Sequence, residues 1–239
     1  MGLECYPSPF FAILSLDKEK MTASMSVNRE DYLKVIFELG GAKQSVYNKA
    51  ISEVLGLSPA SVTEMISKMA KDNMVTYTPY RGTKLSEEGI LQGANLVRRH
   101  RLWEVFLYDK LKYTWENVHD EAEMLEHNAS DFFVEKLADF LGNPEFCPHG
   151  GAIPTVDGEM AEEVETTLVD FEIGDDIRIQ RVTDEKEFLM YIDQLGLKIG
   201  KKYTITGVEA FTNNVILTKK GNEIVVNREA AQHIYVEKE

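Results

Sequence analysis

A change in hydrophobic periodicity is the feature that most constrains the fold of this chain. Up to residue 141, apolar residues recur every three or four positions, as they do in amphipathic helices. From Thr167 onward they fall into short runs, IRIQRV, KYTITGV, NVILTKK and EIVVN, which Gly and Asn turns separate. One helical stretch, residues 185–194, interrupts the series. The pattern predicts an α+β protein with helices first and a small SH3-like β-barrel last.

The first helical region has the spacing of a helix-turn-helix. Residues 28–39 form one amphipathic stretch, and residues 46–55 form a second that ends at Gly56. A third helix is expected to begin almost at once, because Ser58 is a good N-cap and Pro59 suits the first helical position. Two short helices joined by a glycine-containing turn are typical of this motif.

A hairpin is expected directly after the third helix. Residues 74–86 alternate apolar and polar side chains around a turn with Pro79 and Gly82. The whole pattern predicts a winged helix-turn-helix, in which the third helix enters the major groove and a basic wing touches phosphates. The side chains predicted to contact DNA are Ser58, Pro59, Ala60, Ser61, Thr63, Glu64, Lys68, Arg81 and Lys84. The alternative is a helical bundle with a solvated hairpin and no DNA.

The charge of the chain agrees with DNA binding only locally. The net charge of −14 disfavours nucleic acid as a partner, because phosphate binding needs positive charge. Residues 45–101, however, hold eight basic against five acidic side chains, a net charge of +3. Residues 102–239 hold 13 basic against 29 acidic side chains, a net charge of −16. A basic N-terminal part is therefore joined to an acidic remainder.

Two long helices are expected after the hairpin. The first runs from Ser86 to about Lys110 and has more large apolar side chains than one core-facing stripe needs, so part of it is expected to bury against a second subunit. The second is predicted as one helix over residues 116–141. A loop rich in proline and glycine, residues 143–159, then marks a domain boundary.

The apolar runs and the cysteines argue against a membrane protein and against a disulfide-stabilised secreted protein. No apolar run approaches the ~18 residues of a membrane span, so a soluble protein without a membrane partner is expected. Cys5 and Cys147 lie far apart, which argues against a disulfide framework and for a reducing cytoplasm. Residues 1–24 lack the basic start of a secretory signal. We interpret them as an extension of unknown role, a tag remnant, an upstream start or a frayed arm, with Met25 as an alternative beginning.

The stretch HDEAEMLEH, residues 119–127, crowds imidazoles and carboxylates onto one helix. At about 100° per residue, His119, Glu123, Glu126 and His127 share one face. Lone pairs held together at the edge of a core repel one another unless a cation draws them in. The spacing therefore predicts a metal site.

Further candidate ligands lie nearby in the sequence. His100 and Glu104 are four residues apart on the preceding helix, and Cys147 and His149 flank a single residue in the loop. A helix pair linked by salt bridges to the arginines of residues 98–101 is the alternative. That alternative leaves the thiol and imidazole of the loop without a role.

Motifs for catalysis are missing from the sequence. There is no HExxH, GxSxG or phosphate-binding P-loop, and no Cys-x-x-Cys pair for structural zinc. A metalloenzyme with an open coordination position is an alternative that the sequence does not favour. A metal-responsive protein whose winged helix contacts another protein is a second alternative.

Six segments in order, NREDYLKVIFEL, SPASVTEMISKMAKDNMV, YRGTKLSEEG, RRHRLWEVFL, VHDEAEMLEH and CPHGGAIP, resemble the diphtheria toxin repressor family of metal-dependent transcriptional regulators. The resemblance begins at about Ser26 and is strongest to three-domain, manganese-responsive members. It implies a homodimeric repressor that Mn²⁺ activates to bind palindromic operators of metal-uptake genes on double-stranded DNA. The implied domains are a winged helix over residues 25–96, a helical dimerisation and metal-binding domain over residues 97–166, and an SH3-like (FeoA-like) domain over residues 167–239.

The resemblance also implies two metal ions per subunit. The first site would consist of Glu104, Cys147, His149 and Asp184. The second would consist of Asp31, Glu123, Glu126 and His127, with His100 as a shared or neighbouring ligand. Our hypothesis is that Asp31 and Asp184 act as the switch, because a metal bound to them ties the outer domains to the central helices.

The identity of the metal follows from the ligand types. The iron-responsive founding pattern has Met and Cys where this chain has Asp31 and Glu123, and carboxylates favour a harder ion such as Mn²⁺. Cys147 favours a softer ion, so an iron(II)-responsive repressor is the alternative. Zn²⁺ or Cd²⁺ could occupy the sites in vitro.

Overall fold

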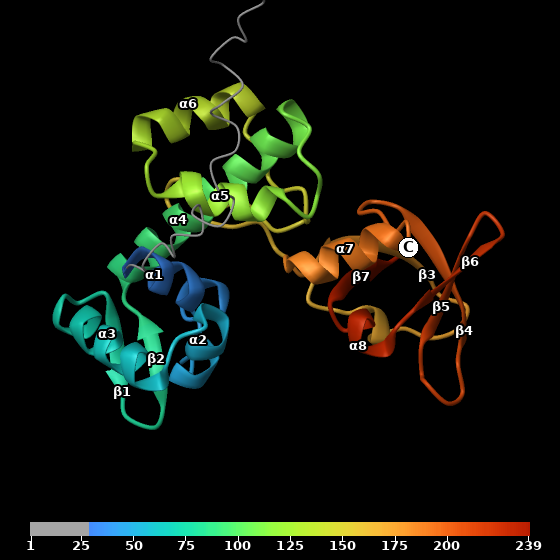
Figure 1. Cartoon of the computed structure of the whole chain (residues 1–239), viewed down its shortest axis with the longest axis horizontal. Helices are drawn as coiled ribbons and strands as arrows, with labels where there is room; N and C mark the ends of the chain where they lie inside the picture. Colours follow the sequence, from blue (N-terminus) through green and yellow to red (C-terminus); the bar gives the residue numbers. More distant parts are fainter. Residues whose placement is uncertain (1–28) are drawn as a thin grey trace, which may run out of the picture.

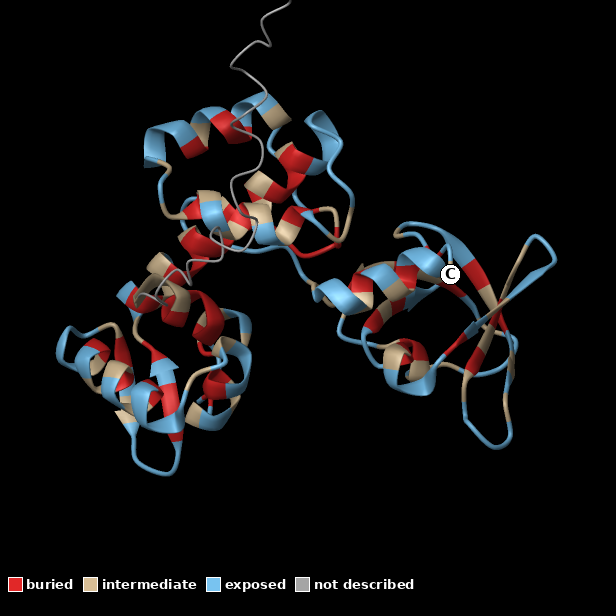
Figure 2. Cartoon of the chain, in the orientation of Figure 1, coloured by how far each residue is buried: buried red, intermediate tan, exposed pale blue. Residues whose placement is uncertain are grey.

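The structure, a computed structural model, describes residues 29–239 and shows three bodies along the chain (Figure 1). Buried residues gather within each body, which has its own core (Figure 2). The mixture of helical bodies and a β domain confirms the predicted α+β class. The interpretation of residues 1–24 lies outside the described residues. Within them, no helix combines the length and apolar character that a membrane span needs.

The N-terminal body is a winged helix-turn-helix. Its elements in chain order are α1 (Arg29–Glu38), α2 (Asn48–Leu55), α3 (Pro59–Lys71), β1 (Val75–Thr78) and β2 (Gly82–Leu85). Gly56 ends α2 in the left-handed conformation, and the Ser58 hydroxyl caps α3 by accepting a hydrogen bond from the Ser61 N–H. The strands β1 and β2 pair in antiparallel fashion and form the wing.

Helical spacing of apolar residues builds the core of this body. Ile36, Ile51 and Ile66 come from three different helices and are fully buried against one another. The wing joins the core through a close approach of two backbones. Gly82 has a φ of +100°, and a Cβ there would lie 2.5 Å from the Val46 carbonyl oxygen, so this position requires glycine.

The central body is helical, and it corrects one prediction. Its elements are α4 (Glu87–Val105), the π-helical turn η2 (Phe106–Lys110), α5 (Val118–Glu126) and α6 (Asp131–Leu141). The single helix predicted over residues 116–141 is wrong, because α5 ends at His127 and α6 starts anew. The Ser130 hydroxyl accepts a hydrogen bond from the Phe133 N–H and caps α6. A serine with extended backbone at this point favours a new helix start over a continuous helix.

The C-terminal body is a five-stranded antiparallel sheet with the strand order β6-β5-β4-β3-β7. Its elements are η3 (Leu168–Asp170), β3 (Asp176–Val182), α7 (Lys186–Gln194), β4 (Lys202–Val208), β5 (Val215–Lys219), β6 (Asn222–Val226), α8 (Arg228–Ala231) and β7 (Ile234–Lys238). The predicted β runs and the predicted helix all appear, whereas β7 was not predicted. Ile177, Leu189 and Leu217 lie at the centre of its core.

The loop between the central and C-terminal bodies is fixed to strand β3. The Val182 N–H donates a hydrogen bond to the His149 carbonyl oxygen at 3.0 Å. Gly150 has a φ of +84°, and a Cβ there would lie 2.1 Å from the Gln180 carbonyl oxygen. This contact of two backbones places Asp184, two residues beyond β3, beside the side chains of the loop.

Candidate metal centre

The central body, the loop after it and the C-terminal body contribute to a first group of candidate ligands, which we call the Glu104 cluster: His100, Glu104, His119, Cys147, His149 and Asp184. Candidate ligand atoms lie within 4.8 Å of one another in two overlapping sets that share Glu104. The His149 Nδ1 lies 3.3 Å from Glu104 Oε1 and 3.4 Å from Asp184 Oδ2. The four residues predicted for the first site are therefore neighbours, although no single set contains all four.

Burial and imidazoles together set the charge state of this cluster. Glu104 is fully buried, which by itself would raise its pKa, but the charge of His100 and contacts with His119 and His149 hold the pKa well below its usual range. Burial would likewise lower the pKa of His119, but Asp184 and Glu104 raise it to about 10. The imidazoles therefore carry positive charge where a metal ion would otherwise balance the carboxylates.

Unpartnered atoms provide a test of whether metal fits. Among the described residues, Glu104 Oε2 and Asp184 Oδ1 are buried without a hydrogen-bond partner. Buried polar atoms without partners are costly and call for an explanation such as an ion. Burial first, and Glu104 second, raise the pKa of the Cys147 thiol, which a metal would have to deprotonate. Oxygen, nitrogen and sulfur donors facing one space fit a divalent cation.

The second group of candidate ligands, which we call the Glu126 cluster, is Asp31, Glu123, Glu126 and His127. One candidate atom of each lies within 4.8 Å of the others, so the structure brings the predicted set together in full. Glu126 is fully buried, and the His127 Nε2 lies 3.0 Å from Asp31 Oδ1. Asp31 belongs to α1 of the winged helix, whereas the other three belong to α5 and its C-cap.

One buried imidazole connects the two clusters. The His100 Nδ1 lies 2.5 Å from Glu126 Oε2, and its Nε2 lies 3.2 Å from Glu104 Oε1. His100 thus lies between the two clusters, and its role as a shared or neighbouring ligand stays a prediction. His119 is a residue that the predicted ligand set omitted, and its Nδ1 lies 2.9 Å from Asp184 Oδ2. Its place on the acidic face of HDEAEMLEH was the signal that could have assigned it.

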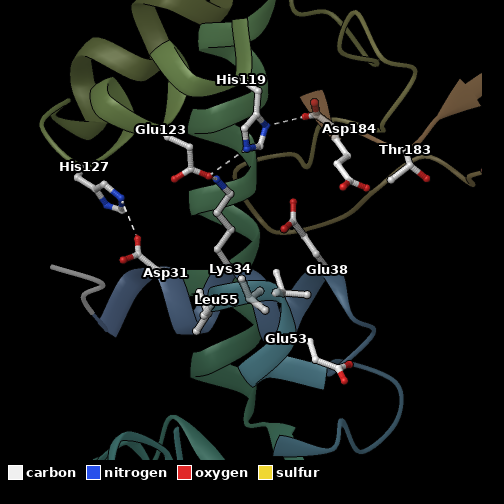
Figure 3. A pocket seen from close by; sticks show the side chains of 13 residues that line it. Asp31, Lys34, Glu38, Glu53, Leu55, His119, Glu123, His127, Thr183 and Asp184 are labelled. Carbon is white, nitrogen blue, oxygen red and sulfur yellow. Dashed lines mark hydrogen bonds and ion pairs between the residues drawn. The ribbon is translucent and has the colours of Figure 1, made fainter. Parts of the chain in front are cut away.

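A cavity of about 800 Å³ opens onto both clusters. Figure 3 shows His119, Glu123 and His127 lining it opposite Asp31 and Lys34. The side chain of Lys34 reaches up from α1 toward Glu123. The cavity thus lies where the winged helix, the central helices and the segment after β3 meet.

The predicted DNA-contacting side chains occupy α3 and the wing. Eight of the nine are exposed, and Thr63 is half-buried, with its hydroxyl donating a hydrogen bond to the Pro59 carbonyl. Glu64 and Lys68 form an ion pair at 2.8 Å across one turn of α3. The wing also carries Tyr80, a residue not predicted, whose side chain is 99% exposed. These placements leave the face free for DNA, and the contacts themselves stay predictions.

Exposed aromatic residues gather on the central body. Phe132, Phe133 and Phe140 of α6 are exposed by 75%, 46% and 65%. The surface predicted to meet a second subunit was on the helix that ends near Lys110, where Leu102 and Val105 are instead buried within the chain. Trp103 and Phe106 of that helix are half-buried and contact Phe133 and Phe140, so α6 extends the predicted surface, and the subunit interface itself stays a prediction.

Comparisons with known families match all three bodies. The family described as "Iron dependent repressor, N-terminal DNA binding domain" matches residues 24–83. The family "Iron dependent repressor, metal binding and dimerisation domain" matches residues 86–155, and the FeoA domain matches residues 166–238. These matches agree with the predicted order of domains. The predicted boundary between residues 96 and 97 falls inside α4, and the exact boundaries stay predictions.

Similar proteins include transcriptional regulators and repressors, and solved structures of metal-responsive regulators. The HTH-type transcriptional regulator MntR of Oceanobacillus iheyensis is 37% identical over 112 residues, 47% of this chain and 76% of that protein. The diphtheria toxin repressor of Corynebacterium efficiens is 26% identical over 221 residues, 87% of this chain and 94% of that protein. The structure of the manganese regulator SloR has a TM-score of 0.76 and 38% identity and covers 90% of this chain and 100% of its own. ScaR with bound Zn²⁺ has a TM-score of 0.77 and 39% identity and covers 89% of this chain and 100% of its own.

Proposed function

Because the chain belongs to the diphtheria toxin repressor family of metal-dependent transcriptional regulators, we propose that Mn²⁺ at the Glu104 and Glu126 clusters switches its winged helix into the DNA-binding arrangement. Its relatives are named as regulators and repressors, so the chain is a transcriptional repressor rather than an enzyme. DNA and a second copy of the chain are its partners.

One observation carries the proposal: each cluster takes a carboxylate from an outer body. Asp31 comes from α1 of the winged helix, and Asp184 comes from the segment after β3. A divalent ion supplies the positive charge that lets such carboxylates stand together in a buried place. Asp31 would then hold α1 against α5, and Asp184 would hold the C-terminal body against the central helices. The spacing of two winged helices in a dimer decides whether both reach a palindromic operator.

The composition of the clusters supports Mn²⁺ as the natural ion. The Glu126 cluster offers three carboxylates and one imidazole, a set of hard donors. Cys147 in the Glu104 cluster is a softer donor, which keeps Fe²⁺ as the second candidate. The two clusters support two ions per subunit. Relatives are named for both metals, since ScaR is a manganese-activated repressor and IdeR is an iron-dependent one.

A DNA-binding titration tests the proposal. Operator sequences are first selected from a random DNA library with the full chain in Mn²⁺, and affinity is then measured by fluorescence anisotropy with Mn²⁺ or with chelator. We expect chelation to weaken binding by a factor of about 100, the size of a typical allosteric coupling. Equally tight binding with chelator present contradicts the proposal.

Two substitutions make the test specific to the switch. Asp31→Ala is expected to reduce the Mn²⁺-dependent gain in affinity and to leave the dimer intact in analytical ultracentrifugation. Asp157→Ala, a change of an exposed aspartate in the loop before the C-terminal body, is the control and should behave as the unmodified chain. A monomeric Asp31→Ala variant would mean that Asp31 is structural and is not part of the switch.

A further inference from the structure

A buried lysine lies inside the Glu126 cluster. Lys34 of α1 is only 4% exposed. Its Nζ donates to Glu123 Oε1 at 2.5 Å and to the two oxygens of Glu126 at 2.9 and 3.1 Å. The same atom lies 3.0 Å from His100 Nδ1. An amphipathic helix normally leaves a lysine in solvent, so its burial among these three side chains requires a reason.

The electrostatics of the cluster explain why the lysine is tolerated there. Burial alone would lower the pKa of Lys34, but the charges of Glu126, Glu38 and Glu123 raise it above its usual value. The ammonium of Lys34 donates to three carboxylate oxygens, so it acts as a cation of this cluster. It brings one positive charge to a cluster in which Asp31, Glu123 and Glu126 bring three carboxylates. Without this ammonium, burying the carboxylates of the metal-free chain would be strongly unfavourable.

We propose that Lys34 is the resident cation of the metal-free Glu126 cluster, and that a divalent ion binds there only by displacing its ammonium group. This inference rests on the proposed function, because it assumes that the cluster binds metal. Divalent ions hold carboxylate oxygens at about 2.0 to 2.6 Å. An ion bound by Glu123 and Glu126 would therefore occupy the space of an ammonium group that contacts the same oxygens. The two cations repel each other strongly at such a distance in a buried site.

The exchange has a consequence for the sensitivity of the switch. Lys34 and Asp31 lie three positions apart on α1, and Asp31 is the residue of α1 in the candidate ligand set. In the metal-free chain, Lys34 links α1 to α5 through Glu123 and Glu126. Metal has to break this link before Asp31 makes the new one. Lys34 therefore raises the concentration of free metal at which the cluster fills, which makes it a residue that sets the response threshold.

Calorimetric titration of the metal-free full chain with Mn²⁺ tests the inference. The titration is expected to show one Mn²⁺-binding step for each cluster. The step of the Glu126 cluster is the one whose affinity the Asp31→Ala substitution lowers. Lys34→Met removes the charge and keeps the length of the side chain. Because the loss of one partner of a buried pair destabilises only the state that contains the pair, we expect this step to become tighter by at least about tenfold. The midpoint of thermal unfolding should fall for the metal-free variant and not for the Mn²⁺-loaded one.

The matched control is Lys43→Met, which removes an exposed lysine of the same body. It should leave the Mn²⁺ affinity of the step unchanged. If the Lys34→Met variant binds Mn²⁺ no more tightly than the unmodified chain, the inference that Mn²⁺ displaces the Lys34 ammonium is wrong, and the proposed function stands. If the unmodified chain binds no Mn²⁺, the proposed function fails and the role of Lys34 fails with it.

A second measurement needs no variant and therefore does not depend on whether Lys34→Met folds. The unmodified chain is acetylated briefly at its amines, with chelator or with Mn²⁺, and each lysine is quantified by peptide mass spectrometry. Lys34 should be protected with chelator and become several-fold more reactive with Mn²⁺, whereas exposed Lys43 should react equally in both. Equal protection of Lys34 in the two samples overturns the inference.

Discussion

At the scale of single residues, the two clusters differ in how their negative charge is balanced. The Glu104 cluster uses imidazoles, above all His119 and His149, whose pKa values neighbouring carboxylates raise. The Glu126 cluster has the imidazoles of His100 and His127 and, in addition, the ammonium of Lys34. Both arrangements stabilise a metal-free chain that would otherwise bury carboxylates without a counter-charge. The two clusters should consequently respond differently to pH.

The imidazole of His119 gives the metal-free chain a defined pH dependence. Its pKa is about 10 in the folded chain against 6.5 for the free side chain. Since the folded value is the higher one, its contribution to the free energy of unfolding is complete below pH 6.5 and disappears as pH rises through 10. We expect chelator-treated protein to lose stability to urea over this range. The His119→Gln variant should lose less over the same range, and an identical pH profile for both would contradict the assignment.

The candidate ligands could be predicted from the sequence where they stood close together in one helix or loop. Glu123, Glu126 and His127 share a face by helical geometry alone, and the structure places them together. Lys34 could not be predicted, because a lysine in an amphipathic helix is normally solvated. Its burial depends on how α1 packs against α4 and α5, and local spacing does not encode that packing.

At the scale of elements, the ends of helices decide where the ligands point. The break between α5 and α6 lets α5 stop at His127, so that this imidazole lies at a helix terminus beside Asp31. The break between α5 and α6 was not predicted because the helical spacing of apolar residues continues through Leu125, Ala129 and Phe132. The structural signal was Ser130, an N-cap residue in the middle of an apparently continuous pattern.

The cap at Ser130 should therefore contribute measurably to stability. Ser130→Ala removes the acceptor of the Phe133 N–H and is expected to lower the free energy of unfolding by about 1 kcal/mol, the usual cost of losing such a cap. Urea unfolding followed by circular dichroism measures the difference. Ser45→Ala, at an exposed position before α2, is the control and should change stability by less than about 0.5 kcal/mol.

At the scale of the whole molecule, regularities of fold were easier to predict than contacts between bodies. The order of winged helix, helical body and β domain follows from the change in periodicity along the chain. Strand β7 was not predicted, although it pairs with β3 at one edge of the sheet. Its short run, IYVEK, lacks the following turn residues that mark the other β runs. The subunit interface stays a prediction, since helical spacing does not tell which of two apolar faces is covered within the chain.

The aromatic surface of α6 predicts how the dimer can be broken. Phe132→Glu combined with Phe140→Glu places two charges on side chains that are 75% and 65% exposed in the single chain. If α6 forms the interface, sedimentation should show a monomer whose circular dichroism is unchanged. Phe211→Glu, at a residue 97% exposed in the C-terminal body, is the control and should leave the dimer intact. A dimeric double variant would place the interface elsewhere.

The approach of Gly150 to strand β3 has a consequence for how this protein can vary. The two backbones lie so close here that even one methyl group would push the loop that carries His149 away from the C-terminal body. Gly150 has no side chain with which to contact DNA or coordinate an ion. A side chain there would nevertheless move His149 away from Asp184. A regulator altered in this way would lose its response to metal although every candidate ligand remained in the sequence.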